Sequence, residues 1–341
     1  MKVSFLVTFY NQAQFVRNSL DSILAIKKNC DWEILVGDDG SSDETVSIVS
    51  EYIKKYPDKI KLYIMPRNPG EKYKSVQRAS FNRLNLLEHC QGDFFCIIDG
   101  DDFYSCGDFI DQAISLFQQN EKLSVLAFNY QKIYSNGNIE KANTIDVASN
   151  TIVSYSDYLR KCYIHAGACV FKNTFKSDKA SIDKLKRIAS FDDSDIIVNA
   201  FNYGSMFFSD KVIYNYRQTE EGLWTDINEI EQNILNLVSF DLEAAIAPSL
   251  EKDLFFRSFV AIYNVWHIRK SLTEKISETN LLKYDIMLEG INKFKTLSFN
   301  ILHYKNISLY MKASIKAKIY LFILRHPKFF LLNLRDVLLK R

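Results

Sequence analysis

Asp93-Phe-Phe-Cys-Ile-Ile-Asp-Gly-Asp-Asp-Phe-Tyr104 is an apolar run that ends in three carboxylates, Asp99, Asp101 and Asp102. Such a run predicts a buried strand, and an α/β sheet binds ligands beyond the carboxyl ends of its strands. Acidic groups this close repel one another unless a cation compensates them, and hard divalent cations bind carboxylates together with substrate phosphates. The stretch therefore favours a site for a metal ion and a diphosphate. The alternative is a solvated acidic loop.

Strands and helices alternate through the first 130 residues. Apolar runs predict strands at 2–9, 32–38, 60–65, 94–99 and 123–130. Amphipathic stretches predict helices near 12–29, 43–56, 74–90 and 107–120. This alternation indicates βαβ units and a mainly parallel sheet. We expect Asn11 to cap the first helix and Ser41-Ser-Asp-Glu44 to form a capping box at the second.

The rest of the chain divides into three parts. Residues 131–150 are polar and predict a surface loop, and 151–225 predict a second functional part of the same α/β domain. From 226 to 341 the pattern is helical. Six scattered cysteines form no Cys-x-x-Cys pair, and no apolar run approaches the roughly 20 residues of a membrane span. These features predict a cytosolic protein with reduced thiols.

The end of the chain combines cations with large apolar side chains. Residues 305–341 hold nine Lys or Arg and one acid, Asp336. A basic helix with a broad apolar side is typical of interfacial membrane helices, so this stretch predicts peripheral binding to an anionic membrane surface. The alternative is packing on the domain or on another subunit of a homo-oligomer. Nucleic acid is not expected, because the cations are mixed with aliphatic residues and form no aromatic platform.

Two further loops are expected at the sheet edge that carries the acidic stretch. One follows the first strand at Thr8–Asn11, and the other follows the second strand at Gly37–Asp43. The Asp39 carboxylate can accept from an imide N–H or a ribose hydroxyl, and Tyr10 offers a ring face for a base. Asp43 is interpreted as a helix cap.

Three motifs resemble the family 2 inverting glycosyltransferases. They are Ser4-Phe-Leu-Val-Thr-Phe-Tyr-Asn11, Glu33-Ile-Leu-Val-Gly-Asp-Asp-Gly-Ser-Ser-Asp43 and Ile98-Asp-Gly-Asp-Asp102. They come in the family's order and spacing, and the match extends to about residue 224. The resemblance implies a GT-A type fold over 1–225, with the nucleotide-sugar donor bound by 1–130 and the acceptor and catalytic groups in 151–225. The helical region 226–341 follows.

The resemblance also implies donor-side roles. Thr8, Tyr10, Asn11 and Asp39 would hold the nucleoside. Asp99 would face the ribose or a metal ion, and Asp101 would ligate a Mn²⁺ or Mg²⁺ that bridges the diphosphate and acts as a Lewis acid for the leaving group.

Phe191-Asp-Asp-Ser-Asp195 places carboxylates just before a predicted helix. An inverting displacement needs a base that takes the proton of the acceptor hydroxyl. Asp193, at the last acid of the family's Glu-Asp pair, is predicted to be that base, and Asp192 is the next candidate. The alternative is an N-capping cluster, and Asp195 is interpreted as compensating the helix dipole.

Two later segments complete the candidate site. In the resemblance, His165-Ala-Gly-Ala-Cys-Val-Phe-Lys172 lines the acceptor site, with His165, Ala166 and Gly167 as candidate contacts. Tyr216-Arg-Gln-Thr219 resembles the family's Tyr-Arg-x-His segment, but Thr219 stands where a histidine often helps to bind metal. Arg217 is the first candidate for phosphate binding. Lysines and an arginine after the third strand come next, namely Lys72, Lys74 and Arg78.

The function predicted from these residues is transfer of a sugar from a UDP-sugar to a hydroxyl of a glycan or lipid-linked saccharide in bacterial surface polysaccharide synthesis. An Asp-x-Asp phosphatase is disfavoured, because Phe103 stands where that class has Thr or Val. A nicotinamide enzyme is disfavoured because no Gly-x-Gly-x-x-Gly follows the first strand. A catalytically inactive glycan-binding or scaffold subunit remains an alternative, against which the presence of Asp101 and Asp193 argues.

Overall fold

The computed structural model describes residues 1–219, except 69, 72–74, 106, 143–145, 156, 159–163 and 189–190, together with Glu243 and Ala247. The chain divides into two units, Met1–Asp226 and Ile227–Arg341. The elements below belong to the first unit. The helices predicted over 226–341, including the basic stretch 305–341, lie outside the described residues.

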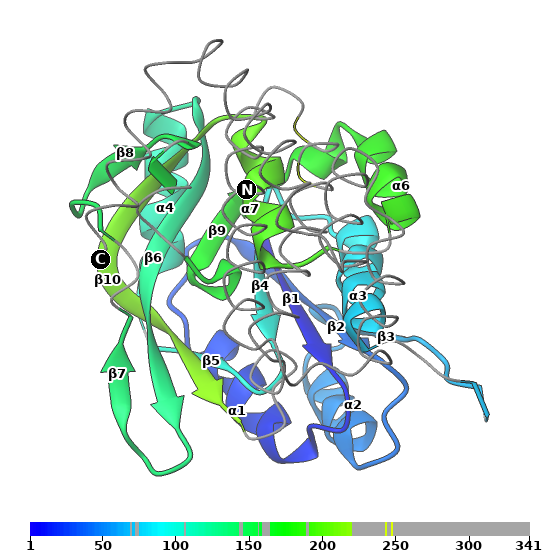
Figure 1. The fold of residues 1–341 in the computed structure, drawn as a ribbon. Helices are drawn as coiled ribbons and strands as arrows, with labels where there is room; N and C mark the ends of the chain where they lie inside the picture. Colours follow the sequence, from blue (N-terminus) through cyan, green and yellow to red (C-terminus); the bar gives the residue numbers. More distant parts are fainter. Residues whose placement is uncertain are drawn as a thin grey trace, which may run out of the picture. The chain divides into compact units, whose positions relative to one another are not determined.

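A mixed sheet forms the centre of the first unit (Figure 1), and ten strands belong to it in the described part of the chain. In chain order they are β1 (Lys2–Phe9), β2 (Asp31–Asp38), β3 (Ile60–Ile64), β4 (Phe94–Asp99), β5 (Phe103–Tyr104), β6 (Leu123–Tyr134), β7 (Ile139–Lys141), β8 (Thr151–Val153), β9 (Cys169–Lys172) and β10 (Ser205–Gln218). The main path runs β3-β2-β1-β4-β9-β6-β10-β5, with β7 on β6 and β8 on β10.

The first half of the sheet is parallel, as the alternating pattern predicts. β1 pairs in parallel with both β2 and β4, and β2 pairs in parallel with β3. The second half is mixed, because β9 runs antiparallel between β4 and β6 whereas β6 and β10 are parallel. This is the mostly parallel α/β sheet that the sequence predicts.

The prediction of a loop over 131–150 is wrong in part. β6 continues to Tyr134 because β10 runs beside it as far as the pair Tyr134 and Gln218. The chain then turns at Gly137, whose φ of 83° suits a residue without a side chain, and returns as β7. A polar stretch does not reveal such a strand, since the pairing partner lies far along the chain.

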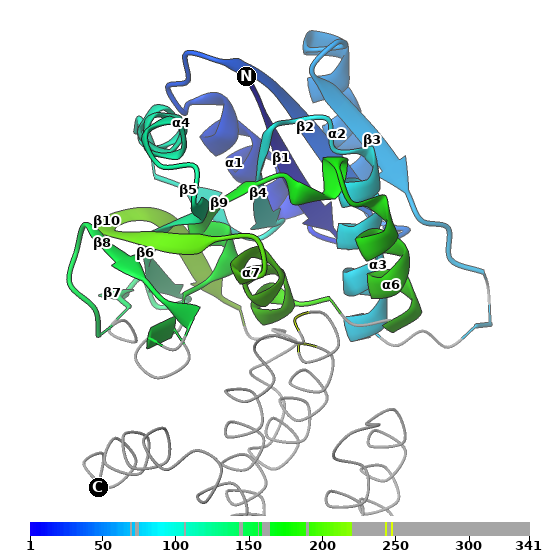
Figure 2. The same ribbon diagram turned by 90° about the horizontal axis from the view of Figure 1, so that it is seen from above.

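Helices cover both faces of the sheet. Figure 2 shows α1 (Ala13–Leu24), α2 (Thr45–Lys55) and α4 (Phe109–Gln119) on one face, and α3 (Ser75–His89), α6 (Lys179–Ile188) and α7 (Asp193–Phe201) on the other. Short 3₁₀ turns, η1 (Ala166–Ala168) and η2 (Thr174–Lys176), flank β9. Among the helices of the described residues, none is long and apolar enough to cross a bilayer.

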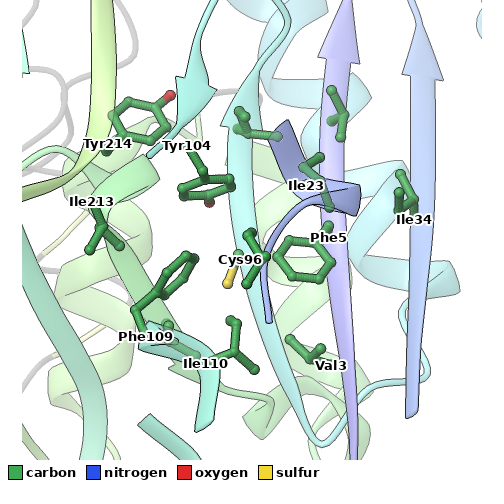
Figure 3. Packing of buried hydrophobic residues seen from close by; sticks show 14 of the residues in the cluster. Val3, Phe5, Ile23, Ile34, Cys96, Tyr104, Phe109, Ile110, Ile213 and Tyr214 are labelled. Carbon is green, nitrogen blue, oxygen red and sulfur yellow. The ribbon is translucent and has the colours of Figure 1, made fainter. Parts of the chain in front are cut away.

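The main core lies between the sheet and the helices of the first face. Figure 3 shows Phe5 of β1 and Cys96 of β4 facing Ile23 of α1 and Ile110 of α4. Every second residue of β1 enters this core, as the two-residue period of a strand requires. Val16, Leu20 and Ile23 of α1 are fully buried, as the apolar positions of an amphipathic helix should be. The packing holds the ends of β1, β2 and β4 in place at one edge.

Both predicted helix caps are wrong. Asn11 has a φ of 49° and does not cap α1, whose cap position is Gln12. The Asn11 side-chain oxygen instead accepts from Ser42 N at 2.8 Å. The box at 41–44 does not form either, because α2 begins after Glu44 without a side-chain cap. Asp43 accepts from Ala13 N at 2.9 Å and so caps α1 from the neighbouring loop.

Candidate active site

Three strand ends meet at one edge of the sheet. Thr8 near the end of β1 stands in register with Gly37 of β2 and with Asp99 of β4. The loops beyond them are tied together, since Gly100 N donates to Thr8 O and Asp39 N donates to Phe9 O, both at 2.9 Å. The structure therefore brings Thr8, Asp39 and Asp99 to the edge where α/β sheets bind ligands.

The acidic loop after β4 is held from behind by β10. Asp102 is fully buried and accepts from the Tyr214 hydroxyl at 2.6 Å and from Arg217 N at 2.8 Å. Burial and repulsion from Asp101 and Asp99 raise the pKa of Asp102 well above its usual value, although both donors oppose the rise. Burial and the Asp99 charge likewise raise the pKa of Asp101 to about 6. Asp101 and Asp102 are therefore harder to ionise here than isolated carboxyl groups.

This loop also meets the histidine of the 165–172 segment. Asp99, Asp102 and His165 can each offer a ligand atom within 4.8 Å of the others. Carboxylate and imidazole ligands suit Mn²⁺, and the mutual repulsion of the acids would be relieved by a cation. The residues present therefore fit a divalent metal ion. Asp101, the ligand predicted from the sequence, lies beside this group and is not part of it.

Arg217 fixes the front of the same loop. Its guanidinium donates to Asp101 O and, at 2.8 Å, to Asn18 Oδ1. It also lies over the rings of Phe103 and Phe15, 4.5 and 5.0 Å from their centroids. Burial lowers its pKa, against the attraction of Asp102 and Asp101. Arg217 thus joins the acidic loop to α1. Thr219 is the residue after the end of β10.

Asp39 is surrounded by two arginines. Arg78 Nε donates to Asp39 Oδ1 at 2.5 Å, and Arg67 pairs with Asp39 Oδ2 while its Nε donates to Asp39 O at 2.7 Å. The Arg67 guanidinium also lies 3.9 Å from the centroid of the Tyr10 ring, which is 44% exposed. Asp39 and Tyr10 therefore lie close together, as predicted. Arg78, a candidate for phosphate binding, contacts Asp39 in this structure. Lys72 and Lys74 lie outside the described residues.

Asp192 and Asp193, the two acids at the start of α7, have different surroundings. Asp192 is the N-cap of α7, and its Oδ1 accepts from Ser194 N and Asp195 N at 3.0 and 3.2 Å. Asp192 N in turn donates to Asp195 Oδ2 at 3.0 Å, which completes a capping box. Asp193 takes no part in this cap. Its Oδ2 lies 3.5 Å from His165 Nδ1 and 3.4 Å from Ala166 N, on the side of the metal-ligand group.

His165 and the small residues after it are buried. The His165 ring lies 5.0 Å from the ring of Tyr214 and 4.7 Å from that of Tyr216, and its Nδ1 accepts from Gly167 N at 3.1 Å. A Cβ at position 167 would lie 2.2 Å from Tyr214 Cζ. The absence of a side chain at Gly167 therefore makes room for Tyr214.

Sequence reasoning missed Arg83. This residue lies on α3, and its Nη2 donates to Asp99 Oδ1 at 2.7 Å while its Nη1 lies 3.5 Å from Asp193 Oδ1. Burial opposes ionisation of Asp99, yet Arg83, with help from His165 and Thr8, keeps the Asp99 pKa below its usual value. Arg83 is also buried, which would lower its pKa. The charges of Asp99 and Asp193 outweigh this effect, so the pKa of Arg83 is raised. No local pattern distinguishes Arg83 within α3, and none distinguishes Arg67 in the loop that follows β3.

A GT-A type α/β sheet with an acidic loop beyond β4 defines the class of nucleotide-sugar-dependent glycosyltransferases. Residues 4–181 match the family described as glycosyl transferase family 2, and the chain belongs to that family. It is similar to the S. aureus protein TarS (residues 1–349) solved with UDP and with UDP-GlcNAc, with a TM-score of 0.62 in both cases and 15% and 16% identity over 92% of each chain. At this level of sequence identity, the similarity shows that the two proteins share a fold.

Proteins related in sequence match only part of the chain. The chain is 26% identical over 188 residues to GalNAc(5)-diNAcBac-PP-undecaprenol beta-1,3-glucosyltransferase of Campylobacter jejuni, covering 52% of this chain and 54% of that protein. It is 33% identical over 101 residues to the putative glycosyltransferase EpsE of Bacillus subtilis, covering 30% and 33%. Against the first curated relatives, uncharacterized mycobacterial proteins, the chain spans 35% of their length.

Proposed function

We propose that this chain is an inverting glycosyltransferase that moves a sugar from a UDP-sugar to a hydroxyl of a glycan or lipid-linked saccharide. One observation carries the proposal: Asp193 of α7 faces the donor-side acid Asp99, with Arg83 between them. An inverting reaction needs a base opposite the leaving group. Family membership supports a nucleotide-sugar as the donor. Asp99 would lie on the side of the leaving group, and Asp193 on the side of the attacking hydroxyl.

In the proposed reaction, Asp193 takes the proton of the acceptor hydroxyl as its oxygen attacks the anomeric carbon. The new glycosidic bond forms as the bond to the diphosphate breaks, and UDP leaves with the electron pair. Asp193 is suited to this role because its carboxylate is not used to cap α7 and is only partly buried, with 18% of its side chain exposed. Contacts to Ala166 N and Arg83 Nη1 orient its oxygens.

The donor would bind along the edge formed by β1, β2 and β4. Tyr10 offers an exposed ring on which the nucleobase of the donor can stack. Asp39, Arg67 and Arg78 offer hydrogen-bond acceptors and donors to the nucleoside. Asp99, with Asp101 or Asp102 and His165, would hold a Mn²⁺ or Mg²⁺. When bound, such an ion supplies Lewis-acid stabilisation of the departing diphosphate.

The proposed acceptor is supported by a relative, and the proposed location at the membrane is supported by the end of the chain. The Campylobacter relative is named for an undecaprenol-linked saccharide, and residues 305–341 combine nine cations with large apolar side chains. We therefore assign to this chain a lipid-linked acceptor at the cytoplasmic face of the membrane, reached by peripheral binding. A role in surface polysaccharide synthesis follows from that acceptor class.

Titration calorimetry and a UDP-release assay on the full chain test the proposal. UDP should bind in the presence of Mn²⁺, and at least one of UDP-glucose, UDP-galactose and UDP-GlcNAc should be hydrolysed slowly with water as acceptor. Failure to bind UDP and to release it from any donor would contradict the proposal. Binding without any turnover, even with lipid-linked saccharides added, would instead support an inactive binding subunit.

A further inference from the structure

Helix α3 sends four polar side chains to parts of the site that lie far apart in the sequence. Arg78 reaches Asp39 after β2, and Asn82 Nδ2 donates to Gly37 O at 3.0 Å. Ser80 Oγ accepts from Phe191 N at 2.9 Å, just before α7. The fourth is Arg83, so α3 connects the loops after β2 and β4 to the start of α7, the helix that carries Asp193.

Arg83 makes the most direct of these connections. It pairs with Asp99, the last residue of β4, and with Asp193, the first residue of α7. Its side chain is 13% exposed, and its Nε has no hydrogen-bond partner. A buried cation is costly unless it is paired, and here both pairing groups are carboxylates of the proposed site.

The guanidinium group suits a bridge between two acids. It is planar and presents its N–H donors in a fixed fork, so that Nη1 and Nη2 can meet different carboxylates at once. A lysine ammonium at this position has one nitrogen and could approach only one of them well. The distance between Asp99 and Asp193 is therefore set by a rigid group and not by the loops that follow β4 and precede α7.

We propose that Arg83 is a positioning residue that couples the donor side of the site to the base. By holding Asp99 and Asp193 in one geometry, it keeps the anomeric carbon of a donor bound at Asp99 within reach of a nucleophile activated by Asp193. This inference rests on the proposed function. It predicts that Arg83 and Asp193 act as one unit in turnover, while Arg83 contributes little to the affinity for UDP.

A double-mutant cycle on the full chain tests this coupling. Wild type, Arg83→Gln, Asp193→Asn and the double variant are compared for kcat of UDP release, KM for the donor, calorimetric Kd for UDP and thermal midpoint. Arg83→Gln should lower kcat about 30-fold or more and change the Kd for UDP by less than about threefold, because the lost contact acts on the base. In the Asp193→Asn background the same change should lower kcat by less than about threefold.

Arg17→Gln is the matched control, since Arg17 of α1 makes an exposed pair with Glu51 of α2, and it should leave every value unchanged. If Arg83→Gln does not fold, Arg83→Lys takes its place in the cycle, and the same losses are expected. Independent, multiplicative losses in kcat, or a fall in thermal midpoint with kcat retained, would overturn the inference. A wild type that neither binds UDP nor releases it contradicts the proposed function itself.

Discussion

The Tyr214 hydroxyl donates to Oδ2 of Asp102 at 2.6 Å and joins β10 to the acidic loop after β4. Tyr214 is fully buried, as is Asp102. Arg217 N, three residues further along β10, donates to the other oxygen of the same carboxylate. β10 therefore sets the position of the acidic loop Asp99–Asp102.

Removing this hydroxyl should destabilise the protein. Tyr214→Phe leaves a buried carboxyl short of one donor, and we expect a loss of about 1–3 kcal/mol in the free energy of unfolding, measured by urea denaturation. Tyr134→Phe is the control, because Tyr134 makes an exposed hydrogen bond to Glu140 and should cost less than about 0.5 kcal/mol. Equal effects of the two changes would show that the buried bond does not hold the loop.

A buried glutamate at the opposite end of the sheet should make stability depend on pH. Glu33 is 2% exposed and accepts from Ser4 Oγ at 2.6 Å and Gln91 N at 2.9 Å, and it pairs with Lys2. Burial opposes ionisation, but these partners outweigh it and lower the Glu33 pKa. Because the folded-state pKa lies below the unfolded one, the stabilisation is present above the unfolded pKa and is lost as pH falls through the folded one.

Glu33→Gln should therefore destabilise the protein at pH 7 by about 1–3 kcal/mol, and the difference from wild type should shrink as the pH falls below about 4.5. Urea denaturation at pH 7, 5 and 3.5 measures it. Glu51→Gln, which removes an exposed carboxylate, is the control and should show little effect at any pH. A difference that grows toward low pH would contradict the sign of the pKa shift.

Asp193→Asn should separate binding from turnover. Loss of the base should cut UDP release by about two orders of magnitude or more while the Kd for UDP is kept. Asp192→Asn is the neighbouring control: asparagine caps helices about as well as aspartate, so both the stability and most of the turnover should be retained. Near-normal turnover in Asp193→Asn would pass the role of base to another acid, with Asp192 first in line.

Asp101→Ala should remove the metal dependence of UDP binding. Burial and the charge of Asp99 raise the pKa of Asp101 to about 6, and a cation would relieve the repulsion between the two acids. Calorimetry with and without Mn²⁺ measures the effect, and UDP should bind the variant weakly in both cases. If Mn²⁺ still strengthens UDP binding to the variant, the ligands are instead Asp99, Asp102 and His165, which His165→Ala would then test.

The basic end of the chain should bind anionic vesicles. The full chain is expected to sediment with them, and a chain ending at residue 304 is expected to stay in solution while still releasing UDP. Salt should weaken the charged part of binding, since the Debye length is about 8 Å at physiological ionic strength, while insertion of Phe322, Phe329 and Phe330 should persist. A full chain that ignores vesicles, together with a shortened chain that unfolds, would mean that 305–341 packs on protein.

Local patterns in the sequence determined the strands and helices of the first 130 residues. Each depends on a periodicity within a few turns of chain, and the buried stripe of α1 at Val16, Leu20 and Ile23 follows from spacing alone. The meeting of Thr8, Asp39 and Asp99 was also predictable, because parallel strands end at one edge. The family's motifs supplied the class of donor.

Tertiary structure alone decided which charged groups meet. Asn11 does not cap its own helix because Asp43 of the next loop takes that place, and residues 131–134 form strand because β10 lies beside them. Gly167 is small to admit Tyr214, and Arg83 bridges Asp99 and Asp193 from a helix with no motif. Periodicity reports which face of an element is buried, whereas the partner of a buried charge depends on elements packed together from distant parts of the chain.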